Sequence, residues 1–236
     1  MALATSYTNE SEQTNACLAL KSWLRCHPKY RSLVPDEGAA GKPLAPTLAP
    51  KSLLDEVQAL YLQAANTSGT VDAGVQGGLG VLYNLLGDYD KAVDCFNAAL
   101  SADPTDSRLW NKLGATLANS NRSAEAVPAY QRALQLSPGF IRCRYNLGIA
   151  CINLKCHRQV PASAAEHFLS ALNLQAAGRG LEEKFSRTAV SDNLWSILRV
   201  CLPPLDLTRL LPALNNRDLA ALNAAFKDLP SGPPPS

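Results

Sequence analysis

The sequence predicts an all-α protein, built as a superhelix of stacked antiparallel helix pairs that ends in a C-terminal helical bundle. The first observation behind this prediction is a Leu-Gly pair that recurs with its glycine at Gly80, Gly114 and Gly148, each 34 residues after the last. An interval of 34 residues is typical of a stacked helical repeat in which each copy is one helix–turn–helix unit. The second observation is that further landmarks follow the first two glycines at equal offsets.

These landmarks lie 12, 16, 19 and 24 residues after the glycine and are, in order, an alanine, an aromatic residue, a second alanine and a proline: Ala92, Phe96, Ala99 and Pro104, then Ala126, Tyr130, Ala133 and Pro138. Small residues let the first helix of a pair (helix A) and the second (helix B) approach closely. The leucine and the aromatic ring fill the remaining space, and the proline ends helix B. This is the pattern of the tetratricopeptide repeat.

Composition narrows the class of protein further. The chain of 236 residues carries 22 basic and 20 acidic residues, for a net charge of +2, with no long run of either sign. We therefore expect no nucleic-acid surface. The seven cysteines form no Cys-x-x-Cys pair, which suits a reducing compartment. Because the chain opens with no secretory signal and has no run of about 18 apolar residues, we expect a cytoplasmic protein that does not insert directly into a membrane.

The N-terminal part is expected to contain an incomplete repeat. Residues 1–30 fit the template with Ala4 at the glycine position, which places Met1 already inside helix A. We therefore expect a truncated form of a longer protein, since solenoid ends are normally sealed by capping units. Residues 31–51 are rich in Gly, Pro and Ala and read as a linker. Residues 52–72 hold a connecting helix with helical apolar spacing.

Two complete repeats follow, at 73–106 and 107–140. A third occupies 141–178, but Phe168 stands four residues later than the repeat predicts and Pro161 falls where helix B should begin. We expect an insertion near 159–163, in the turn between the two helices, which costs little entropy. Beyond the repeats the sequence predicts three segments: a loop at 179–190, a C-terminal helical bundle at 191–229 and a disordered tail at 230–236.

A stripe of polar residues on the A helices is the candidate binding surface. Arg142 and Asn146 are four residues apart and Asn146 and Asn153 seven, so each pair lies on one side of its helix. The leucine and glycine of each repeat must face helix B, which turns the stripe toward the concave surface of the superhelix. Carboxamides can hydrogen-bond the backbone of an extended peptide, and cations can receive a carboxylate. The predicted peptide-binding residues are Asn84, Asn111, Lys112, Arg142, Asn146 and Asn153. The alternative is that these side chains are simply solvated.

Catalysis is not expected, because the chain lacks a nucleophile elbow, a paired-carboxylate site and a dinucleotide loop. Cys156, His157 and His167 match no zinc spacing. We therefore expect neither an enzyme, a metal site nor a cofactor.

Two stretches resemble a known family closely, LWNKLGATLAN at 109–119 and IRCRYNLGIACIN at 141–153. They are similar to the C-terminal half of the peroxisomal targeting signal type 1 receptor, a tetratricopeptide-repeat import receptor. The resemblance covers most of the chain and is strongest from Leu79 to Asn153. It implies a receptor module that grips the C-terminal Ser-Lys-Leu-type peptide of peroxisomal matrix proteins, with the six predicted peptide-binding residues contacting the peptide backbone and its terminal carboxylate. It also implies a cytoplasmic location with association at the peroxisomal membrane.

The resemblance also implies a peroxisomal docking machinery as partner, although the Trp-containing docking motifs of the family do not occur in this sequence. Two alternatives stay open. One is the receptor's paralogue, a regulatory subunit on the C-terminal tails of ion channels. The other is a chaperone-type repeat adaptor, which would need a denser set of cations than Lys112 and Arg142 supply.

Overall fold

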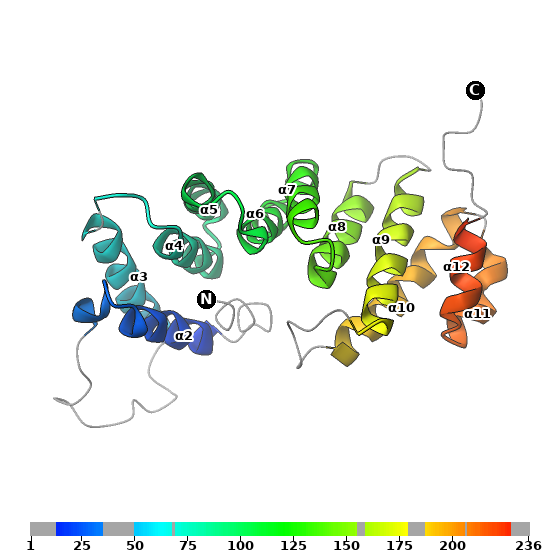
Figure 1. Cartoon of the computed structure of the whole chain (residues 1–236), viewed down its shortest axis with the longest axis horizontal. Coiled ribbons are helices and arrows are strands. Elements are labelled where there is room, and N and C mark those ends of the chain that lie inside the picture. Colours follow the sequence, from blue (N-terminus) through cyan, green and yellow to red (C-terminus); the bar gives the residue numbers. More distant parts are fainter. Residues whose placement is uncertain are drawn as a thin grey trace. The chain divides into compact units, whose positions relative to one another are not determined.

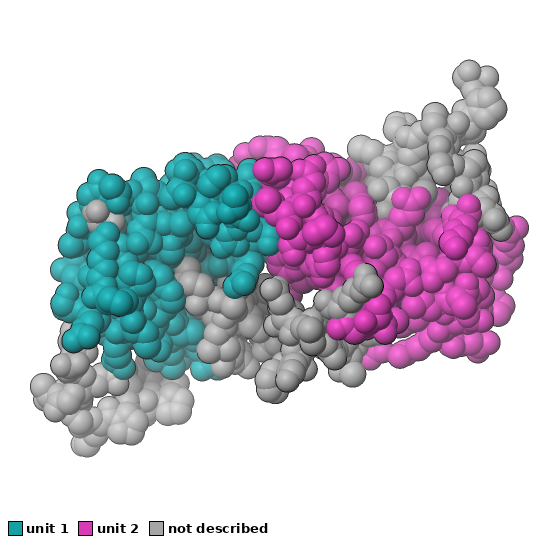
Figure 2. Space-filling model, viewed as in Figure 1, with its two compact units in different colours: residues 1–116 teal, residues 117–236 magenta. Residues whose placement is uncertain are grey.

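The computed structural model describes residues 13–34, 50–67, 69–154, 159–178, 187–205 and 207–227, and within these ranges every regular element is a helix (Figure 1). The chain divides into two compact units, residues 1–116 and 117–236 (Figure 2). The division falls inside helix α6, Ser107–Asn119. Within the described ranges no helix is both long and apolar enough to cross a bilayer.

Unit 1 holds two packed helix pairs and the start of α6. In chain order its other elements are α2 (Gln13–Cys26), the 3-10 turn η1 (Arg31–Leu33), α3 (Pro50–Thr67), α4 (Ala73–Leu86) and α5 (Tyr89–Ala102). Helix α2 packs on α3, α3 on α4, and α4 on α5. The short connection between α4 and α5 makes them antiparallel neighbours, as a tetratricopeptide pair requires.

The interior of α4 is rich in glycine because three aromatic rings lie directly against its backbone. A Cβ built on Gly78 would lie 2.1 Å from the ring of Tyr61 in α3, and one on Gly80 would lie 2.7 Å from the ring of Phe96 in α5. The rings of Trp23 and Tyr61 are themselves stacked, with centroids 6.0 Å apart. Glycine costs roughly 0.5–1 kcal/mol relative to alanine inside a helix. This close packing against buried rings offsets that cost.

The segment predicted as a linker at 31–51 differs from the structure at both ends. Residues 31–33 form η1, and α3 begins at Pro50, where proline fits the first turn of a helix. Tyr30 and Val34 on either side of η1 are buried, and the Tyr30 hydroxyl donates to Asp72 Oδ2 at 2.8 Å. These tertiary contacts hold the start of the segment. The connecting helix predicted within residues 52–72 is α3, which ends at Thr67.

The turn from helix A to helix B uses a left-handed residue in each of the two regular copies. Gly87 has φ of 75° and Asn121 has φ of 62°. In each turn the residue's own N–H and the next one donate back to carbonyls of the preceding helix. Glycine and asparagine are the residues that adopt this conformation most readily, which explains their equivalent placement in the repeat.

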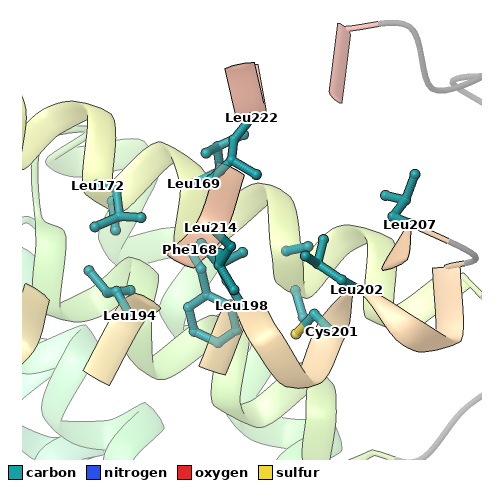
Figure 3. Packing of buried hydrophobic residues seen from close by; sticks show 13 residues of the cluster. Phe168, Leu169, Leu172, Leu194, Leu198, Cys201, Leu202, Leu207, Leu214 and Leu222 are labelled. Atoms are coloured by element: carbon teal, nitrogen blue, oxygen red, sulfur yellow. The ribbon is translucent and has the colours of Figure 1, made fainter. Parts of the chain in front are cut away.

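Unit 2 contains the rest of the repeats and the C-terminal bundle. Its elements after α6 are α7 (Ser123–Leu136), α8 (Ile141–Asn153), α9 (Gln159–Ala176), α10 (Arg187–Cys201), the 3-10 turns η3 (Pro203–Leu205) and η4 (Thr208–Leu210), α11 (Leu211–Asn215) and α12 (Leu219–Lys227). A continuous core joins α9 to α10 and the segments after it. Figure 3 shows side chains of this core, among them Phe168, Leu198 and Leu214.

The prediction of a turn at 159–163 is wrong, because α9 begins at Gln159 and includes these residues. Pro161 occupies the third helical position, where its missing N–H removes no intrahelical hydrogen bond. Phe168 is therefore the tenth residue of its helix, whereas Phe96 and Tyr130 are each the eighth of theirs. Two of the four extra residues are thus added at the N-terminus of helix B.

Several predicted segments lie outside the described residues, wholly or in part. They are residues 1–12 of the N-terminal incomplete repeat, most of the loop at 179–190, and the tail at 230–236.

Candidate peptide-binding site

Three of the predicted peptide-binding residues belong to unit 1, where they lie on two A helices. Asn84 is in the last turn of α4, and Asn111 and Lys112 are adjacent in α6. Asn111 is buried, with 7% of its surface exposed, and Lys112 is partly exposed. A buried carboxamide needs hydrogen-bond partners, so Asn111 is a constrained polar group rather than a solvated one.

A chain of hydrogen bonds joins Asn84 to the turn of α6 that carries Lys112. The Asn84 Nδ2 atom donates to Thr116 Oγ1 at 2.6 Å. The Thr116 hydroxyl in turn donates to the main-chain carbonyl oxygen of Lys112 at 2.9 Å. Thr116 is completely buried. The amide donor of Asn84 is therefore engaged by the protein itself, and the two A helices of unit 1 are tied together at this level.

Thr116 is not among the site residues predicted from the sequence, although its place in the repeat marks it as unusual. Thr116 is the tenth residue of its repeat, and the same position holds Leu82 in the previous copy and Ala150 in the next. A hydroxyl at a position that is otherwise apolar and buried requires an internal partner. Asn84, two positions later in the previous repeat, supplies that partner.

The Lys112 ammonium is in an unusual electrostatic environment. Burial lowers the pKa of Lys112 to about 8; Asp106 opposes this shift and Arg108 adds to it. Within the part of the chain that the structure describes, Lys112 forms no ion pair. At pH 7 the side chain is still mostly protonated, so it is a cation that has lost hydration and forms no ion pair with a described residue. A ligand carboxylate would supply that counter-ion.

Unit 2 carries the other three predicted residues, all on helix α8. Arg142 and Asn146 are partly buried, and Asn153, the last residue of the helix, is exposed. Their spacing of four and seven residues lines them along one side of α8. Gly148 of the same helix faces α9, where a Cβ added to it would lie 2.5 Å from the Phe168 ring. The two groups of predicted residues thus occur on equivalent helices of successive repeats.

Side chains suited to metal binding or catalysis do not converge in the described ranges. No group of three His, Cys, Asp or Glu residues is close enough there to hold a metal ion. His167 lies in α9, and burial together with Arg144 lowers its pKa. Cys156 and His157, considered with it in the sequence, lie outside the described residues.

The fold and the repeat landmarks define a tetratricopeptide-repeat protein. A family model described as "Tetratricopeptide repeat" matches residues 79–139. Among solved structures, the crystal structure of MamA has a TM-score of 0.51 at 19% identity, over 76% of this chain and 98% of that one. A second MamA structure has a TM-score of 0.50 at 19% identity, over 78% of this chain and 94% of that one. At this identity the likeness establishes the fold alone.

Curated relatives identify the family within that class. The peroxisomal targeting signal receptor of Candida albicans is 47% identical over 177 residues, 74% of this chain and 29% of the relative. That of Eremothecium gossypii is 38% identical, over 96% of this chain and 38% of the relative. The PEX5-related protein of Mus musculus is 48% identical, over 96% of this chain and 40% of the relative. The chain is a homologue of the peroxisomal targeting signal receptors, a non-enzymatic family, and spans well under half the length of these relatives.

Proposed function

We propose that this chain is a receptor module that binds the C-terminal Ser-Lys-Leu-type targeting peptide of peroxisomal matrix proteins for import. The observation that carries the proposal is the Asn111–Lys112 pair on α6, a buried carboxamide beside a partly desolvated cation that has no protein counter-ion in the described ranges. Such a pair suits a peptide terminus, because the amide can bond the peptide backbone and the ammonium can bind its carboxylate. The names of the relatives support the choice of ligand.

The three residues of α8 extend the same chemistry to a second helix. Arg142 offers a planar guanidinium suited to a carboxylate, and Asn146 and Asn153 offer carboxamides. We assign all six residues to the peptide-binding surface, with Asn84 contributing through its hydrogen bond to Thr116. The module acts in the cytoplasm, with association at the peroxisomal membrane through the docking machinery of the family.

The test is fluorescence anisotropy of an N-acetylated labelled peptide ending in Ser-Lys-Leu, titrated with the chain, beside the same peptide with an amidated C-terminus. Hydrogen bonds to charged groups contribute about 1.5–3 kcal/mol, so amidation should weaken binding by about 10- to 100-fold. Lys112→Gln should remove most of this discrimination between acid and amide. Equal binding of the two peptides, or no binding by a folded helical chain, would reject the proposal.

A second candidate is a regulatory subunit that binds the C-terminal tails of ion channels. The observation that favours it is that the PEX5-related proteins match this chain at 48% identity over 230 residues, as closely as the receptors do. The same titration separates the two functions. A clear preference for Ser-Lys-Leu over unrelated C-terminal peptides with a free carboxylate supports the import receptor, and a preference for channel tails supports the subunit.

A further inference from the structure

We propose that Thr116 is a positioning residue for Lys112 and that Asn84 influences peptide binding through Thr116. This inference rests on the proposed function, because it assigns a role to side chains around the same Lys112 ammonium. It changes what is expected of Asn84, which the sequence places among the residues that touch the peptide.

Two hydrogen bonds fix the Thr116 hydroxyl. Thr116 Oγ1 accepts from Asn84 Nδ2 at 2.6 Å and donates to the Lys112 carbonyl oxygen at 2.9 Å. A hydroxyl has one proton, so donation to Lys112 fixes its rotor and aims its lone pairs at the Asn84 amide. The two hydrogen bonds polarise and strengthen each other. Thr116 is fully buried, so water does not compete for its hydroxyl.

These bonds connect the end of α4 to one turn of α6. Asn84 is in the last turn of α4, and its main-chain carbonyl accepts from the N–H of the left-handed residue Gly87. Its side chain is therefore anchored at a helix end whose geometry is already fixed. Through its bond to Thr116, the end of α4 restrains the turn of α6 that carries Asn111 and Lys112. A threonine hydroxyl bonded to the carbonyl four residues earlier also tends to bend a helix locally, which sets the direction of that turn.

The position of the Lys112 ammonium depends on this turn of α6. A binding site must be held close to its productive geometry by the residues around it, so looser support of the Lys112 ammonium should weaken its discrimination between a carboxylate and an amide. If the Thr116 hydroxyl is lost, the Asn84 amide is left without its buried acceptor and the turn relaxes. We therefore expect the selectivity for a free C-terminal carboxylate to fall.

The experiment compares Thr116→Val, which has nearly the same shape but no hydroxyl, with Thr116→Ser, which retains the hydroxyl. The free-acid and amidated Ser-Lys-Leu peptides are titrated against each variant. Thr116→Val should lower the affinity ratio of acid to amide by roughly 5- to 30-fold, and Thr116→Ser should stay within about 3-fold of the parent chain. A matched control is Thr67→Val, because Thr67 makes the same bond to a carbonyl four residues earlier, Gln63 O at 2.7 Å, but is exposed. This control should leave the ratio unchanged.

A double-mutant cycle of Asn84→Leu with Thr116→Val tests whether Asn84 acts through Thr116. If it does, the double variant should bind no more weakly than the worse single variant, whereas direct contact of Asn84 with the peptide predicts that the two losses add. Additive losses, or a Thr116→Val ratio equal to that of the parent, would overturn the inference. If Thr116→Val does not fold, the cycle is run with Asn84→Leu and Thr116→Ala, which also lacks the hydroxyl. Failure of the parent chain to prefer the free acid would instead reject the proposed function.

Discussion

The ring of Phe168 in α9 lies directly against the backbone of Gly148 in α8, so closely that a Cβ at Gly148 would be 2.5 Å from two ring carbons. Phe96 and Gly80 have the same relationship in unit 1, at 2.7 Å. In the sequence the two pairs differ, because Phe168 follows its glycine by 20 residues and Phe96 follows its glycine by 16. The close contact between the helices is thus retained in the third repeat. The four extra residues lie between α8 and Phe168, partly in the connection and partly at the start of α9.

Gly148→Ala should destabilise the protein by about 1–2 kcal/mol. Overpacking against a buried ring costs typically 1–3 kcal/mol, and the better helix propensity of alanine returns up to about 1 kcal/mol. Urea denaturation followed by circular dichroism measures the difference. Gly139→Ala is the control, because nothing lies within 4 Å of its added Cβ. Equal loss in both variants would show that the Phe168 contact is not the cause.

Tyr30→Phe should lower the stability at pH 7 by about 1–2 kcal/mol, because its hydroxyl donates to the Asp72 carboxylate. Burial raises the pKa of Asp72, but the bonds from Tyr30 and from the N–H groups of Val75 and Gly74 outweigh it and hold this pKa below its ordinary value. The stabilisation is therefore present above the unfolded-state pKa of about 3.9 and is lost as the pH falls through the lower folded-state value.

Urea denaturation of the Tyr30→Phe variant and the parent chain, repeated from pH 7 down to pH 3, measures this loss. The difference between them should shrink at the acid end of the range. In an Asp72→Ala background, Tyr30→Phe should have little effect at any pH. An undiminished loss in that background would mean that the hydroxyl acts through another group.

Binding of a peptide with a free C-terminal carboxylate should weaken as the pH rises above 8. Burial lowers the pKa of Lys112 to about 8 in the unliganded chain, and only the protonated form attracts a carboxylate. Affinity should be nearly constant from pH 6 to 7 and should fall toward tenfold per pH unit above 8. Anisotropy titrations with an N-acetylated peptide across pH 6–9.5 measure the profile. Lys112→Arg, which stays charged throughout, should flatten it, and a profile unchanged by this substitution would contradict the assignment.

Native thiol labelling should modify Cys26 before the buried cysteines Cys17, Cys143 and Cys201. Burial raises the pKa of Cys143 to about 12 and that of Cys17 and Cys201 to about 11, whereas Cys26 is exposed. Because the thiolate is the reactive form, Cys26 should react with 5,5′-dithiobis(2-nitrobenzoic acid) well before these three. Peptide mapping by mass spectrometry after timed quenching identifies the labelled sites. Labelling of Cys143 at the rate of Cys26 would show that the α7–α8 region opens readily.

The all-helical repeat fold was predictable because its signals are local and periodic. Gly80 and Gly148 mark close contacts between helices, and the left-handed turns at Gly87 and Asn121 need residues that tolerate positive φ. The family resemblance rested on the same stretches, and the relatives confirm it. The assignment of the six polar residues to a peptide-binding surface stays a prediction.

The sequence by itself determined the class of fold and the helical face on which each polar residue lies, since both follow from spacing along one chain. Only the tertiary structure decided which of these groups are already engaged. The bond from Asn84 to Thr116 spans 32 residues and that from Tyr30 to Asp72 spans 42, so no local pattern encodes either one. The start of α9 at Gln159 was likewise visible only in the structure, and Pro161 is compatible with it because a proline costs a helix little in its first turn.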